Sequence, residues 1–302
     1  MLAQNPDLWL FLGDNIYADT DGTTAWEISE SQLTGEWNRL ADKPEWQHFC
    51  PRAPIMATWD NHDYGSHAGG REFPHKEISR KAFLTFFKES KDSPRWTRDG
   101  IYDAKIFGPE GKRVQVILLD TKFNRSTFKK DPAPKDKRLT AGKVGGYLPD
   151  DRPVNTHLGA EQWKWLEAEL TKPAELRLLC SSTQVIPNEK GMDEWGNFPH
   201  ERRRLLDLAE DAGNVVILSG NVHFAEISQT EDGDLVEFTS SGMTHVNETY
   251  ANTRNSYRLA GPYAELNFGL VEIEWGESVI VTLKAIGIDG TVGIEEQATM
   301  GE

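Results

Sequence analysis

The sequence predicts a layered α/β fold, in which helices cover a sheet built largely of parallel strands. Three observations predict it: five near-continuous apolar runs have the length of strands, helix-like stretches lie between them, and polar residues gather where the runs end. The chain has 302 residues, of which 38% are hydrophobic and 10% aromatic, so it can bury a large core. One domain over residues 1–302 is the simplest organisation.

Strands and helices are expected to alternate along the first two thirds of the chain. The strand-length runs are Asp7–Leu12, Ala53–Thr58, Val114–Leu119, Leu176–Ser181 and Val215–Ser219. The helix-like stretches are Trp26–Leu40, Glu77–Phe87, Ala160–Leu170 and Glu201–Ala209. The last two carry large apolar residues three and four positions apart, which is the spacing of one helix face.

The pattern changes beyond His223. Short alternating segments such as "FAEISQT", "LVEFTSS" and "SVIVTLKAI" are joined by turns such as "EDGD", which predicts an antiparallel sheet returning over the core. Residues 129–152 are rich in proline, glycine and charge, which predicts a surface loop or lid.

Composition and the absence of certain motifs argue against several classes of function. The formal net charge is −15, from 48 acidic and 33 basic residues, so long-range electrostatics oppose nucleic acid as a partner. Cys50 and Cys180 lie far apart in sequence and give no disulfide framework. The sequence has neither the G-x-S-x-G elbow of serine hydrolases nor a P-loop. No apolar run is long enough to span a bilayer, and no signal peptide follows Met1.

The five polar clusters are expected to form one site, because the carboxyl ends of parallel strands open onto a common crevice. They read "GDNIYAD", "WDNHDYG", "DTKFNR", "STQ" and "GNVHFAE". Their side chains are oxygen and nitrogen ligands for hard or borderline cations. Asp14 could bridge two ions, with Asn61, Asn221 and His223 at other positions. Two ions roughly 3.5 to 4 Å apart would clamp a phosphoryl group and generate a metal-bound hydroxide for in-line attack.

These motifs, in this order, together with "SSTQVIP" and "EWGNFPHERRRLL", resemble the PhoD-like alkaline phosphatases of the calcineurin-like metallophosphoesterase superfamily from Asp7 to about Trp275. The resemblance implies a metallophosphatase-type β-sandwich flanked by helices, in four α-β-β-α layers. It implies hydrolysis of phosphomonoesters, often with phosphodiesters, at a binuclear or multinuclear centre of Fe3+ and Ca2+, with zinc or manganese as alternatives. A monomer acting on a small phosphate ester is expected, and a periplasmic or extracellular location is suggested by the resemblance alone.

The resemblance also assigns roles to individual residues. Asp14 matches the bridging aspartate, Tyr17 the tyrosinate ligand of ferric iron, and His223 the iron-ligating histidine. Asn61 occupies the ligand position of the general GNH[DE] motif and Asp60 the position of its glycine; His62 matches the histidine that contacts phosphate. His62 and Asp60 are therefore the candidate catalytic residues.

Lys122 and Arg125 lie where the family places basic residues that can face phosphate, although solvated loop charges are an equally good reading.

The sequence also departs from the family pattern. The family's upstream strand, with its Gly-Ser-Cys turn, has no counterpart in these residues. The family usually has Asp at the position of Asn221, many members have a second Asp at that of Asn61, and Lys122 replaces an Arg. Fewer anionic ligands imply weaker metal binding. The alternative function is therefore a non-catalytic or N-terminally truncated relative that binds phosphate or metal.

Overall fold

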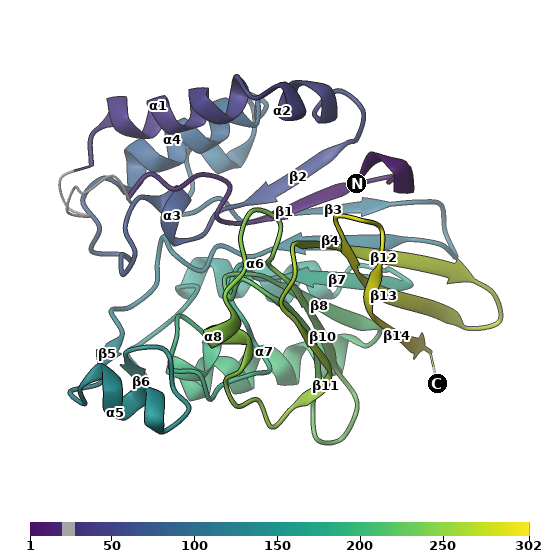
Figure 1. Ribbon diagram of the computed structural model, residues 1–302. Coiled ribbons are helices and arrows are strands. Elements are labelled where there is room, and N and C mark those ends of the chain that lie inside the picture. Colours follow the sequence, from purple (N-terminus) through teal and green to yellow (C-terminus); the bar gives the residue numbers. More distant parts are fainter. Residues whose placement is uncertain (20–27, 302) are drawn as a thin grey trace.

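The computed structural model describes residues 1–19 and 28–301 and confirms the layered α/β fold (Figure 1). Its largest element is a seven-stranded mixed sheet in the order β11-β9-β10-β8-β7-β4-β3. In that order the strands are Arg258–Tyr263, Ala225–Gln229, Val236–Ser240, Val215–Ser219, Leu176–Cys180, Val114–Leu118 and Asp103–Phe107. Strands β4, β7 and β8 run parallel, as expected from their continuous apolar runs.

Two helices cover one face of this sheet. Helix α6 (Ala160–Leu170) begins and ends where the apolar spacing predicts, and α7 spans Pro199–Ala212. Trp163 and Leu166 of α6 and Leu205 of α7 are buried against the sheet. The spacing of the large residues therefore identified the face of each helix correctly.

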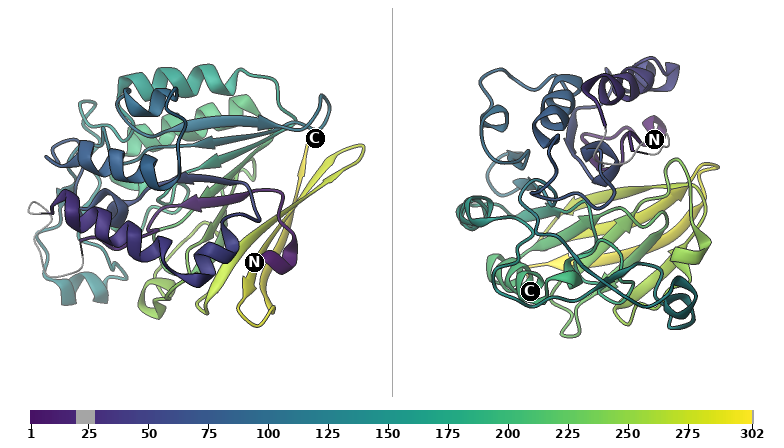
Figure 2. Two further views of the ribbon diagram at one scale, coloured as in Figure 1. Left: turned by 90° about the horizontal axis from the view of Figure 1, so that it is seen from above. Right: turned by 90° about the vertical axis from the view of Figure 1, so that its left-hand side faces the viewer.

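Two smaller sheets cover the other face. One is the antiparallel sheet β12-β13-β14 (Asn267–Trp275, Val279–Gly287, Val292–Met300), and the other is the parallel pair β1-β2 (Trp9–Leu12, Ile55–Thr58). Helices α1 (Glu30–Ala41) and α4 (Lys76–Phe86) close the outside of β1-β2. Figure 2 shows helices on both outer sides with the sheets between, which confirms the four-layer arrangement.

Short elements complete the chain. They are α2 (Pro44–Phe49), α3 (Asn61–Tyr64), α8 (Glu248–Ala251) and the 3-10 turns Leu2–Gln4, Pro94–Trp96 and Trp195–Asn197. The proline- and glycine-rich stretch 129–152 contains a small antiparallel pair, β5 (Lys129–Lys130) with β6 (Tyr147–Leu148), and helix α5 (Lys135–Thr140). Its surface position agrees with the prediction, whereas its helix was not foreseen.

Two expectations need correction. The segments "FAEISQT" and "LVEFTSS" form β9 and β10, which extend the seven-stranded sheet instead of returning over the core, because β10 pairs parallel with β8. Helix α1 begins at Glu30, where the Ser29 side chain accepts a hydrogen bond from the Gln32 amide; the predicted start at Trp26 lies outside the described residues.

None of the described helices is long and apolar enough to cross a membrane.

Candidate functional site

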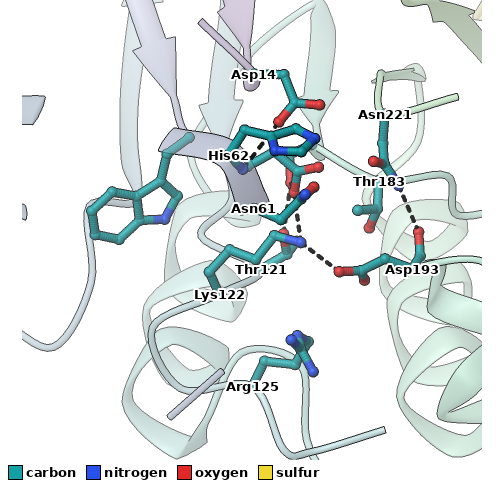
Figure 3. A network of polar contacts seen from close by, with 12 residues as sticks. Asp14, Asn61, His62, Thr121, Lys122, Arg125, Thr183, Asp193 and Asn221 are labelled. Carbon is teal, nitrogen blue, oxygen red and sulfur yellow. Dashed lines mark hydrogen bonds and ion pairs between the residues drawn. The ribbon is translucent and has the colours of Figure 1, made fainter. Parts of the chain in front are cut away.

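The loops that follow β1, β2, β4, β7 and β8 converge at one end of the sheets, as the sequence predicted (Figure 3). Side chains from all five loops meet there, and the loop after β7 contributes two of them. They are Asp14, Asn61, His62, Lys122, Thr183, Asn221 and Asp193.

The turns after β1 and β2 are locked together. The Asp63 carboxylate accepts hydrogen bonds from the backbone amides of Ile16 (3.0 Å) and Asp60 (2.9 Å) and from Asn15 Nδ2 (3.2 Å). Gly13 has a φ of 116°, and a Cβ there would lie 2.5 Å from the Cβ of Asp60. Only glycine allows this approach, which brings Asp14 beside Asp60.

Three candidate ligands occupy left-handed backbone conformations. The φ values are 53° for Asp14, 71° for Asn221 and 60° for His223. Such values are uncommon outside glycine and raise the conformational energy. Their occurrence at the ends of two different strands indicates that the fold holds these side chains in place at some cost to stability.

Asp14 carries an oxygen that lacks a partner. Its Oδ1 accepts a long hydrogen bond, 3.4 Å, from the amide of His62, while Oδ2 is buried with no hydrogen-bond partner among the described residues. Burial, and then the neighbouring Asp60 carboxylate, raise the pKa of Asp14 well above its usual value. A cation placed at Oδ2 would give this oxygen a partner and would also stabilise the ionised carboxylate.

His62 is oriented by Asp19, which the sequence did not single out. Its Nδ1 lies 2.5 Å from Asp19 Oδ1, and its ring lies against Tyr17 with centroids 4.3 Å apart. Burial acts to lower the pKa of His62, but the hydrogen bond to Asp19 and the charge of Asp14 outweigh it and raise the pKa. Because Nδ1 is engaged, Nε2 is the nitrogen left for a substrate.

Lys122 is not a solvated loop charge. It is fully buried, and its Nζ lies 2.7 Å from Asp60 Oδ1 and 2.5 Å from Asp193 Oδ2. Asp60 Oδ1 also accepts a hydrogen bond from Ser182 Oγ, which leaves Asp60 Oδ2 buried without a partner among the described residues. Lys122 therefore neutralises two carboxylates from different loops, and its role in phosphate binding stays a prediction.

Arg125 is also fully buried, so the solvated reading fails for it as well. Its guanidinium donates to the carbonyl oxygens of Ser126 (2.8 Å), Ala68 (3.0 Å) and Gly69 (2.5 Å) and lies 3.9 Å from the centroid of the Phe128 ring. These contacts make Arg125 a support for the loop after α3. Its role in phosphate binding stays a prediction.

Asn221 and His223 follow β8, as expected. Asn221 Nδ2 donates to the backbone carbonyl of Asp193 (3.1 Å), so its amide oxygen is left facing the site (Figure 3). Burial, followed by the nearby imidazoles of His245 and His62, lowers the pKa of His223 to about 4, which keeps its ring neutral and able to bind a cation.

His245 also lies at the site. Its ring centroid lies 4.1 Å from that of His223, and its Nε2 lies 3.3 Å from the Tyr17 hydroxyl. Thr244 Oγ1 contacts its other nitrogen at 3.0 Å. No motif in the sequence marks this histidine, because it reaches the site from the loop between β10 and β11.

His67 reaches a candidate ligand: its Nδ1 lies 3.3 Å from Asn61 Nδ2. Tyr64 is a core residue whose hydroxyl donates to the Gly70 carbonyl. Gln184 and Glu226 bond to each other at 2.8 Å in a separate buried network.

The donor set fits a cation that prefers oxygen ligands. Asp14 Oδ2 and Asp60 Oδ2 are among the buried polar atoms that lack partners in the described chain, and an ion or a water molecule commonly satisfies such atoms. The side-chain amide nitrogens of Asn61 and Asn221 have other partners, so the amide oxygens are available as metal ligands. Residues 1–19 and 28–301 contain no group of three His, Cys, Asp or Glu side chains that could hold a metal, so a cation here would also need the amide oxygens of Asn61 and Asn221.

The comparisons with known proteins agree with this fold. Residues 1–265 match a family model described as PhoD-like phosphatase. The structure of PhoD is similar with a TM-score of 0.64 at 16% identity, over 97% of this chain and 63% of that one. GAP50, the anchor in the inner membrane complex of Plasmodium, gives 0.56 at 12% identity, over 99% of this chain and 80% of its own.

At these identities the likeness to solved structures shows the fold alone, and the chain spans 63% of the length of PhoD. Comparison with curated proteins gives no match. The family assignment therefore depends on the sequence model, which covers most of the chain and includes every candidate ligand. On that evidence, the chain belongs to the PhoD-like phosphatase family.

Proposed function

We propose that this chain hydrolyses phosphate esters at the site between the β1, β2 and β8 loops, with metal ions held by Asp14, Asn61, Asn221 and His223. One observation carries the proposal: two carboxylate oxygens are buried without partners at the point where strained candidate ligands converge. Membership of the family supports phosphatase activity in general, whereas the class of ester and the identity of the metals are part of what we propose.

Bound cations would supply the chemistry of polarising the phosphoryl group and activating water. The chain's own residues would orient the substrate and move a proton. His62, fixed by Asp19 through Nδ1, would present Nε2 to a phosphate oxygen or to the leaving oxygen. Its raised pKa favours the protonated ring, which suits proton donation to an alkoxide as the ester bond breaks.

Asp60 would support the metal ligands that lie beside it. Lys122 and Ser182 contact its Oδ1, which fixes the orientation of the carboxylate and leaves Oδ2 buried without a partner among the described residues. Tyr17 would reach iron only as a phenolate. Burial and the charge of Asp14 raise its pKa, and a bound cation would reverse that effect.

The test is hydrolysis of 4-nitrophenyl phosphate and bis(4-nitrophenyl) phosphate by protein supplied in turn with Fe3+ and Ca2+, Zn2+ or Mn2+. We expect turnover of the monoester that falls at least 100-fold in His62→Ala. Turnover that is unchanged in that variant would remove His62 from the mechanism. Preference between the two substrates would then decide between phosphomonoesterase and phosphodiesterase activity.

A second candidate is binding of metal or phosphate without catalysis. It is favoured by the neutral Asn221 and by the Lys122 ammonium, which already occupies the space between two carboxylates. The related fold of GAP50, which is described as an anchor, supports a non-catalytic use of this architecture. Stoichiometric metal without turnover of either ester would favour this second candidate.

A further inference from the structure

A lysine ammonium lies inside the candidate site, at a position that would also suit a metal ion. Lys122 Nζ lies 2.5 Å from Asp193 Oδ2 (Figure 3). It also lies 2.7 Å from Asp60 Oδ1, which comes from a different loop. Calcium binds carboxylate oxygens at about 2.3–2.6 Å. An ion that contacted both of these oxygens would therefore need nearly the same place as Nζ, so the ammonium and such an ion exclude each other.

The backbone of Lys122 is held by a buried carboxylate. Asp120 Oδ1 accepts hydrogen bonds from the amides of Lys122 and Phe123, each at 2.9 Å. It also accepts a hydrogen bond from Trp59 Nε1 at 2.9 Å, and Asp120 Oδ2 accepts one from the Ile101 amide at 2.8 Å. Asp120 and Lys122 are both 0% exposed. The lysine side chain therefore starts from a fixed turn and ends at two carboxylates without reaching solvent.

The charges around Lys122 suit one metal ion. Three carboxylates lie at the site, those of Asp14, Asp60 and Asp193, and together they carry a charge of −3 when ionised. The Lys122 ammonium reduces the sum to −2, which one divalent ion balances. The remaining candidate ligands are neutral: Asn61, Asn221 and His223.

Two neighbouring carboxylates have partners of their own. Asp19 Oδ1 lies 2.5 Å from His62 Nδ1. Asp63 accepts hydrogen bonds from the amides of Ile16 and Asp60 and from Asn15 Nδ2. A second divalent ion would therefore leave an excess of positive charge in a buried site, which is energetically costly.

We propose that the site holds a single metal ion, bound at Asp14 with Asp60 beside it, and that the Lys122 ammonium takes the place of a second ion. The Asp60 carboxylate then lies between two cations, the metal ion on the side of Oδ2 and the ammonium on the side of Oδ1. This inference rests on the metal site of the proposed function. It replaces a centre of two ions by one ion and one ammonium.

The test is the number of Mn2+ ions bound per chain, measured by calorimetry on purified protein without substrate. Physiological ionic strength screens weak binding by surface carboxylates. We expect one ion in the wild type and two in Lys122→Ala, because removal of the ammonium frees Asp60 Oδ1 and Asp193 Oδ2. Asp193 Oδ1 also lacks a partner among the described residues, so both oxygens of this carboxylate become available.

Two control variants accompany Lys122→Ala. Lys122→Arg keeps a positive charge beside both carboxylates, and we expect it to bind one ion. Lys81→Met removes a surface lysine that pairs with Glu30 at 2.9 Å, and we expect it to bind one ion as well. If Lys122→Ala is folded, its urea midpoint should rise more on addition of Mn2+ than that of the wild type, because the added ion replaces the lost ammonium.

A further measurement needs no variant. Electron paramagnetic resonance of the wild type with excess Mn2+ distinguishes an isolated bound ion from a magnetically coupled pair, and we expect the isolated ion. A coupled pair, two ions bound to the wild type, or a folded Lys122→Ala that still binds one ion would each overturn the inference. A wild type that binds no ion would overturn it together with the metal dependence of the proposed function. One bound ion without ester hydrolysis would support the inference and contradict the proposed function alone.

Discussion

Replacement of Lys122 by Met tests whether this side chain balances charge or binds phosphate. The Lys122 ammonium lies 2.7 Å from Asp60 Oδ1 and 2.5 Å from Asp193 Oδ2, and the lysine side chain is 0% exposed. Removal of one partner from a buried ion pair costs about 3–5 kcal/mol of unfolding free energy, because an unpaired charge stays buried. Two carboxylates lose their partner here, so we expect a loss near the upper end of that range.

The loss of stability in Lys122→Met should depend on pH, and the direction follows from the pKa of Asp193. Burial acts to raise the pKa of Asp193, but Lys122 and then Arg125 outweigh it, so the net pKa in the native protein is lowered. In Lys122→Met the largest opposing charge is gone, so burial raises this pKa, and stability is lost as the pH rises through the new value. The deficit relative to wild type should therefore be larger at pH 8 than at pH 5.

Urea unfolding followed by tryptophan fluorescence measures the loss, and Lys81→Met is the matched control. Lys81 pairs with Glu30 at 2.9 Å on the surface, where both side chains are more than half exposed. Such a pair contributes at most about 1 kcal/mol. If both variants lose the same small amount, or if Lys122→Met changes only the KM for a phosphate ester, the charge-balancing role is refuted.

Three further predictions concern single side chains. Asp14→Asn should abolish ester hydrolysis while leaving the unfolding free energy equal or higher, because the buried carboxylate is removed and Asn tolerates a φ of 53°; a loss of stability by urea unfolding would contradict this. Asn221→Asp should bind Ca2+ or Mn2+ at least tenfold more tightly in calorimetry, but should be less stable without metal because the donor to the Asp193 carbonyl is lost; unchanged affinity would exclude Asn221 as a ligand. Burial raises the pKa of Glu194 from 4.5 to about 7, so the stability that this residue contributes falls as the pH rises between these values. The unfolding free energy of Glu194→Gln should therefore exceed that of the wild type by roughly 3 kcal/mol at pH 8 and should equal it near pH 4. A gain that is independent of pH would contradict this prediction.

The sequence predicted the centre of the fold well because burial on both faces leaves a clear pattern. The runs that became β7 and β8 are apolar at nearly every position, and both strands are completely buried. Helix α6 has the predicted bounds because its large residues repeat at helical spacing. The placement of β9 and β10 failed, since local alternation does not say which sheet a strand joins.

The candidate site was predicted where a motif directly follows a strand, as for Asp14, Asn61 and His223. It was missed where contacts depend on distant loops. Asp193 lies at the far end of the loop after β7 and His245 between β10 and β11, and nothing in their local sequence marks them. Burial of Lys122 was also missed, because a lysine in a loop is usually solvated and its two carboxylate partners lie far away in sequence.

The central claim is metal-dependent hydrolysis of phosphate esters at the Asp14 site. The most direct test is the rate of 4-nitrophenyl phosphate hydrolysis by protein purified without chelator, with the metal content read on the same sample by plasma mass spectrometry. We expect turnover that is lost after treatment with EDTA and restored by the metals found in the sample. A sample with stoichiometric metal and no turnover, or turnover that survives removal of the metal, would contradict it.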